Sequence, residues 1–141
     1  MHNRGISILV PTLNEKANIS PLIKSLAKTL ASHKITYEII FVDDRSSDFT
    51  RLSIAAFKRR YPVSWYPKLG KRGRGYSIYE GFEYTLYDYI AVVDADNQAG
   101  VQAIPELLKF GSPPEDRPYS SVKSSPTSLP NLSLPGTLTQ F

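Results

Sequence analysis

The sequence has no cysteine among its 141 residues. Disulfide bonds, thiolate catalysis and cysteine-ligated zinc are therefore excluded. It also lacks any apolar run close to the roughly 20 residues that a membrane-spanning helix needs. The segment from Met1 to Gly5 leads directly into a strand-like run, without the apolar core of a signal peptide. We therefore expect a cytoplasmic protein, which could meet a membrane only peripherally, at its cytoplasmic face.

Acidic residues are absent from Lys58 to Arg74, a segment that carries seven basic residues. Such a cluster attracts diphosphates, nucleic acids or anionic membranes, and it serves equally well as a basic loop that keeps a protein soluble. The sequence leaves both interpretations open. The segment contains no recognised nucleic-acid-binding motif, so we expect no nucleic-acid partner.

The length of the chain and its hydrophobic content of 41% suit one domain with a core of its own. Within residues 1–110 the apolar pattern alternates between strand and helix periods. The predicted strands are 6–10, 37–42, 63–66 and 89–93, and the predicted helices are 19–30, 52–57, 78–86 and 104–108. Such alternation predicts an α/β fold, with a mostly parallel sheet between layers of helices.

Proline and polar residues set the expected ends of these elements. Pro11 is expected to stop the first strand. The first long helix begins either with Ser20 as N-cap before Pro21, or earlier, near Asn18. Residues 111–141 hold six of the eleven prolines and seven serines, with no helical or strand period. We therefore expect a single domain at 1–110, followed by a disordered or loosely attached tail.

Two carboxylates, Asp94 and Asp96, follow the last predicted strand. Residues i and i+2 of an extended backbone project to the same side, so these side chains can converge on one point. A hard cation such as Mg²⁺ takes oxygen ligands and shares them with substrate phosphates, whereas two acids in a solvated turn are the alternative. Residues 11–15, 43–44 and 94–96 all fall at carboxyl ends of predicted strands. Ligands bind at that edge of parallel sheets, so we expect one site there.

Four motifs carry a resemblance to a known family. They are Val10-Pro11-Thr12-Leu13-Asn14-Glu15, Val42-Asp43-Asp44 with Ser46 and Asp48, Lys71-Arg72-Gly73-Arg74-Gly75, and Asp94-Ala95-Asp96-Asn97-Gln98. In order and spacing they resemble the family 2 glycosyltransferases, most of all the dolichol-phosphate mannosyltransferase or polyprenyl-phosphate sugar synthase branch. The resemblance covers about residues 5–110. It implies a Rossmann-like GT-A fold whose nucleotide-sugar-binding half occupies residues 1–110.

The resemblance also implies roles for individual residues. Asp94 and Asp96 would be catalytic and would bind Mg²⁺ or Mn²⁺ together with Gln98. The residues that would bind the nucleotide-diphosphate sugar are Pro11, Leu13, Glu15, Val42, Asp44, Asp94, Ala95 and Asp96. Asp44 would contact the base or ribose, although the sequence alone leaves a helix N-cap as its alternative role. The implied donor is a nucleotide sugar such as GDP-mannose or UDP-glucose, and the implied acceptor is a polyprenyl or dolichyl phosphate.

The chain departs from the family pattern at residues 99–102, and the match ends near Phe110. The acceptor-binding half of a GT-A domain is not found beyond that point. A polyprenyl phosphate is already anionic and can attack without a general base, whereas a sugar hydroxyl needs one. We therefore expect a metal-dependent glycosyltransferase, with weak or no activity in the chain as it stands. The alternative is a truncated module that binds nucleotide sugar without turnover. The sequence does not indicate the oligomeric state.

Overall fold

A computed structural model describes residues 5–110 and 137–138 of the chain. Its five-stranded sheet is parallel, in the order β3-β2-β1-β4-β5. The strands are β1 (Ile6–Thr12), β2 (Tyr37–Asp43), β3 (Val63–Pro67), β4 (Tyr89–Val92) and β5 (Thr137–Leu138). The helices are α1 (Lys16–Ser32), α2 (Thr50–Ala55), α3 (Arg74–Gly81) and α4 (Ile104–Phe110), with 3-10 turns η1 (Phe82–Tyr84) and η2 (Ala99–Ala103). The predicted α/β fold is confirmed.

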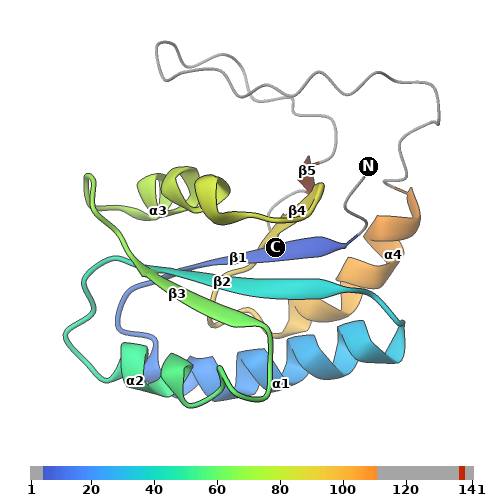
Figure 1. Ribbon diagram of the computed structural model, residues 1–141, viewed down its shortest axis with the longest axis horizontal. Helices are drawn as coiled ribbons and strands as arrows, with labels where there is room; N and C mark the ends of the chain where they lie inside the picture. The colour runs from blue at the N-terminus through green and yellow to red at the C-terminus, as the bar shows by residue number, and fades with distance from the viewer. Residues whose placement is uncertain (1–4, 111–136, 139–141) are drawn as a thin grey trace, which may run out of the picture.

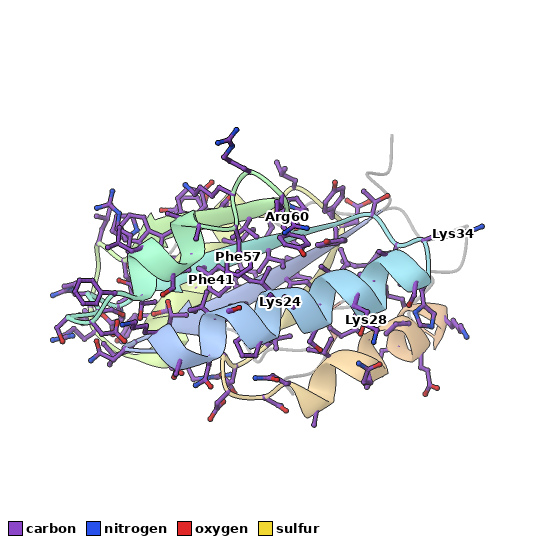
Figure 2. All side chains as sticks on the ribbon, turned by 90° about the horizontal axis from the view of Figure 1, so that it is seen from below. Lys24, Lys28, Lys34, Phe41, Phe57 and Arg60 are labelled. Carbon is purple, nitrogen blue, oxygen red and sulfur yellow. The ribbon has the colours of Figure 1, made fainter. Side chains whose placement is uncertain are left out.

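Helices cover both faces of the sheet (Figure 1): α1, α2 and α4 lie on one face and α3 lies on the other. Alternate strand residues supply a core to each face, as the period of two requires. The larger core lies between the sheet and α1 and includes Phe41, with Phe57 packed against it; Figure 2 labels both. The smaller core, on the α3 face, consists of Leu9, Ile40, Val42 and Val92.

Pro11 does not end β1, contrary to the sequence prediction, because the missing N–H is not needed at this position. The carbonyl of Leu9 accepts a hydrogen bond from the N–H of Val93, on the β4 side. The carbonyl of Thr12 accepts one from the N–H of Asp44, on the β2 side. Since backbone groups alternate along a strand, Pro11 faces the β4 side, where pairing with β4 already stops at Leu9.

Helix α1 begins at Lys16, so the earlier of the two predicted starts is the nearer one, and Pro21 lies inside the helix. The physical reason lies in the following loop. The carboxylate of Asp48 accepts a hydrogen bond of 3.1 Å from the N–H of Lys16. A side chain distant in sequence therefore supplies the acceptor that the first turn of a helix lacks.

Helix α3 ends at Gly81, earlier than the predicted end at residue 86. Leu86 was expected on the buried face of this helix, yet its side chain is 66% exposed. The buried carboxylate of Glu38 accepts hydrogen bonds from the hydroxyl of Ser7 (2.6 Å) and from the N–H of Leu86 (2.7 Å). These bonds hold the segment around Leu86 against β1 and β2, directly before β4 begins.

Gly81→Ala is expected to destabilise the fold by about 1–3 kcal/mol, because overpacking forces a filled core to shift. A Cβ at Gly81 would lie 2.3 Å from Cδ1 of Leu9, which is fully buried. Gly75→Ala is the matched control in the same helix, since nothing lies within 4 Å of its added Cβ. It should stabilise by up to about 1 kcal/mol. Urea unfolding measures both variants, and equal effects would contradict the packing argument.

Within the part of the chain that the structure describes, no helix is long and apolar enough to cross a membrane. The tail predicted at 111–141 lies outside the described residues, apart from β5. Those two residues pair in parallel with Ile90 and Ala91 of β4. The predicted domain boundary at residue 110 stays a prediction.

Candidate functional site

A pocket of about 340 Å³ lies at the carboxyl ends of β1, β2 and β4. Most of the predicted site residues line it: Pro11, Leu13, Glu15, Asp44, Asp94, Ala95 and Asp96. Thr12, together with Gly73, Arg74 and Ser77 around the start of α3, completes the lining. Val42 and Gln98 do not line this pocket. Val42 is fully buried in the smaller core, and Gln98 lies half-buried at the start of η2.

The loops after β1 and β2 hold each other in place at one side of the pocket. Asn14, with φ of 54°, donates its N–H to the hydroxyl of Ser46 at 2.8 Å, and its side-chain oxygen accepts from the N–H of Ser47 at 2.8 Å. Asp48 joins the same network through Lys16 and Thr50. The hydrogen bond from the Thr50 hydroxyl, partly opposed by burial, lowers the pKa of Asp48. These mutual bonds fix the rim that carries Leu13 and Glu15.

Asp44 is 5% exposed and acts as an anchor, not as a helix cap. Its Oδ2 accepts hydrogen bonds from the N–H of Gly73 (2.8 Å) and forms an ion pair with the ammonium of Lys68 (2.9 Å). Burial alone would raise the pKa of Asp44, but the bonds from Gly73 and Lys68, with the charges of Lys68 and Arg72, lower it. Asp44 is therefore an ionised carboxylate that ties the β3–α3 loop (residues 68–73) to the end of β2.

The second oxygen of Asp44, Oδ1, is buried and has no hydrogen-bond partner within residues 5–110 and 137–138. The Nε of Arg72 lies 3.6 Å away from it, beyond hydrogen-bond distance. A buried acceptor without a donor is costly, so it requires an explanation. Because Asp44 lines the pocket, a donor group on a bound ligand would satisfy this oxygen.

Asp94 and Asp96 lie in a turn and not on an extended strand, because β4 ends at Val92. The turn is closed by a hydrogen bond from the N–H of Asn97 to the carbonyl of Asp94. Both side chains nevertheless line the same pocket. Oδ1 of Asp94 accepts a hydrogen bond of 2.7 Å from Nε of Arg74, whereas Asp96 is exposed and has no such partner in the described part of the chain.

The carboxylate oxygens of Asp94 and Asp96 are suitable ligands for a divalent cation. No three Asp, Glu or His side chains gather closely enough to hold an ion among residues 5–110 and 137–138. Mg²⁺, however, commonly binds to one or two carboxylates and completes its shell with water and substrate phosphates. Asp94 and Asp96 are such a pair. Arg74 already neutralises Asp94, so a cation would have to displace or share this contact.

Sequence reasoning did not find Lys68 or Ser77. Lys68 is buried, and its ammonium donates to the carbonyl of Gly73 at 2.9 Å as well as pairing with Asp44. Ser77 is buried on α3 and donates its hydroxyl to the same carbonyl. The available signal for Lys68 was indirect: a carboxylate at the end of β2 and a lysine directly after β3, which is the neighbouring strand.

The sequence profile described as Glycosyl transferase family 2 matches residues 7–116. The chain belongs to this family. A dolichol-phosphate mannosyltransferase of Pyrococcus furiosus is 31% identical to this family 2 chain over 104 residues, which are 74% of the chain and 29% of that protein.

Solved structures agree with this fold. The crystal structure of TarS from S. aureus superposes with a TM-score of 0.62 at 22% identity, over 76% of this chain and 33% of that one. Glucosyl-3-phosphoglycerate synthase from Mycobacterium tuberculosis, in complex with Mn²⁺, UDP and glucosyl-3-phosphoglycerate, superposes with a TM-score of 0.53 at 25% identity, over 67% of this chain and 34% of that one. The chain thus spans about a third of the length of the proteins it matches.

Proposed function

We propose that the chain is the donor-binding half of a metal-dependent glycosyltransferase. It would transfer a sugar from a nucleotide-diphosphate sugar, such as GDP-mannose or UDP-glucose, to a polyprenyl or dolichyl phosphate. The observation that supports this most is the single pocket that contains Asp44, Arg74, Asp94 and Asp96. The names of the relatives agree, since one is a dolichol-phosphate mannosyltransferase and another was crystallised with Mn²⁺ and UDP.

Four charged side chains of the pocket, and Gln98, have roles in this proposal. Asp94 and Asp96 would hold Mg²⁺ or Mn²⁺, and Gln98 would add an amide oxygen from the start of η2. The cation would offset the negative charge that builds on the diphosphate as the sugar leaves. Arg74 would turn from Asp94 to the diphosphate, because guanidinium groups bind phosphate oxygens in pairs. The unpartnered Oδ1 of Asp44 would accept a hydrogen bond from the base or ribose.

The proposed acceptor removes the need for a general base. A polyprenyl phosphate carries an ionised oxygen that can attack the anomeric carbon directly. The remaining requirement is to hold that oxygen in line with the leaving diphosphate. This acceptor would also place the protein at the cytoplasmic face of a membrane, as a peripheral protein.

The proposal is tested by calorimetric titration of GDP-mannose and UDP-glucose, each with and without Mn²⁺. We expect at least one of them to bind and its affinity to depend on the metal. A chain that binds neither under any condition would not be a donor-binding domain. Transfer of radiolabelled sugar to a polyprenyl phosphate is then measured on the same protein.

The second candidate function is a module that holds nucleotide sugar without transferring it. The short span of the chain relative to its relatives favours this candidate, since 29% of the Pyrococcus furiosus protein is covered. Metal-dependent donor binding without radiolabelled transfer would support the module. Transfer by the chain alone would exclude it.

A further inference from the structure

The β3–α3 loop (residues 68–73) stands out from the sheet beside α3 in Figure 1, although hydrogen bonds hold it at several points. The carboxylate of Glu80 accepts from the N–H of Leu69 (3.0 Å) and from the N–H of Gly70 (2.7 Å). The guanidinium of Arg45 donates to the carbonyl of Gly70 at 2.7 Å. The backbone at the tip is therefore fixed in the folded protein.

This fixed backbone holds a large apolar side chain in solvent. Leu69 is 81% exposed, the highest value among the exposed large hydrophobic residues of the described chain. Tyr76 and Tyr79 follow on the outer side of α3 and are 49% and 59% exposed. Exposed leucine and tyrosine side chains within one short segment are typical of surfaces that meet a lipid interface.

The charge on the same surface has one sign. Lys71 and Arg72 are exposed in the loop, and the ammonium of Lys71 lies over the ring of Tyr76, 5.9 Å from its centroid. No acidic residue occurs between Asp48 and Glu80 in the sequence, and both oxygens of Glu80 are bonded to the loop. The nearest exposed acid that follows is Glu83 in η1. An anionic partner would therefore meet attraction over the whole loop.

We propose that the β3–α3 loop docks on the surface of a lipid bilayer that contains anionic headgroups. Leu69 enters the interface, Tyr76 and Tyr79 lie at headgroup level, and Lys71 and Arg72 attract the anionic lipids. The choice of a lipid as partner rests on the proposed function. Since Gly73 and Arg74 line the donor pocket, docking brings the pocket to the membrane, where a lipid-linked phosphate is found.

Basic residues also lie on the opposite face of the sheet, on α1. Lys24 and Lys28 lie on the outer side of α1, on the opposite face of the sheet, as Figure 2 shows, and none of the exposed large hydrophobic residues belongs to α1. Leu52 of α2 is 63% exposed on the same helical layer as α1. These residues therefore provide controls that match the loop variants in charge and in side-chain type.

Flotation with vesicles tests the proposal on the chain as it is. Wild-type protein should bind vesicles of phosphatidylcholine with phosphatidylglycerol, should lose this binding as salt is raised, and should not bind phosphatidylcholine alone. Leu69→Asp should weaken binding about tenfold or more, and Lys71→Gln about fivefold. Leu52→Asp and Lys24→Gln should leave it within about twofold of wild type.

Three results would overturn the docking surface. They are no binding of the wild type to anionic vesicles, unchanged vesicle binding in Leu69→Asp, or a loss of vesicle binding in Leu52→Asp as large as that in Leu69→Asp. Because Leu69 is exposed, its variant should keep the wild-type circular dichroism spectrum. Titration of nucleotide sugar in the absence of lipid separates the two proposals. Normal donor binding together with failed flotation removes the docking surface alone, and failed donor binding with intact flotation removes the proposed function alone.

Discussion

Asp96→Asn is expected to remove metal-dependent binding of the nucleotide sugar, with a loss of about a hundredfold or more. Replacing mere second-sphere partners of metal ligands already costs about 10–100-fold in affinity, and Asp96 is proposed as a direct ligand. Its side chain is exposed and makes no hydrogen bond or ion pair in the described part of the chain, so the fold should tolerate the change. Calorimetry with and without Mn²⁺ gives the affinity, and thermal unfolding checks the fold.

Asp94→Asn would be a less informative variant, because Asp94 also pairs with Arg74. That pair instead supplies a variant with the opposite effect. Without nucleotide, Arg74→Gln should raise the affinity for Mn²⁺ severalfold, since the guanidinium no longer competes for Oδ1 of Asp94; with donor it should weaken binding. Lys71→Gln removes the same charge without touching a carboxylate and is the control. Unchanged metal affinity in both Asp96→Asn and Arg74→Gln would refute the metal assignment.

The sheet was predictable from the sequence because its strands are short apolar runs that end in polar residues. The run before Asp43 and the run before Asp94 are both followed by carboxylates at the edge where parallel strands end. The topology then brings residues distant in sequence to one pocket, since β1 lies between β2 and β4. The period of two also places the side chain of Val42 in the core on the α3 side and not in the pocket, so its role in donor binding stays a prediction.

The ends of elements were less predictable, because distant side chains decide them. Asp48 accepts a hydrogen bond from the N–H of Lys16, where α1 begins. Glu38 accepts one from the N–H of Leu86, which holds the segment after α3 against the sheet and not in a longer helix. A local pattern contains no information about such contacts. The partner of Asp44 is a similar case: Asp43 pairs with Pro67 across the β2–β3 ladder, which places Lys68 beside Asp44 only once the register is known.

Lys68→Met is expected to destabilise the fold by about 3–5 kcal/mol, the cost of removing one partner of a buried ion pair. The Lys68 side chain is fully buried and that of Asp44 is 7% exposed. The variant leaves the Asp44 carboxylate with the N–H of Gly73 and the more distant Arg72. Chemical denaturation near neutral pH measures the loss. Donor affinity should fall as well, because the β3–α3 loop loses its anchor.

The dependence of this loss on pH distinguishes a lost ion pair from a simple packing defect. The pKa of Asp44 is lowered in the folded protein, so its stabilising effect is complete above the ordinary aspartate pKa and is lost as the pH falls below it. In Lys68→Met, burial dominates and should raise the pKa of Asp44, and protonation then relieves the unpaired charge. The difference in the free energy of unfolding between Lys68→Met and wild type should therefore shrink as the pH falls through about 4. A difference independent of pH, or an equal loss in the exposed control Lys71→Met, would show that Asp44 is not held by the charge of Lys68.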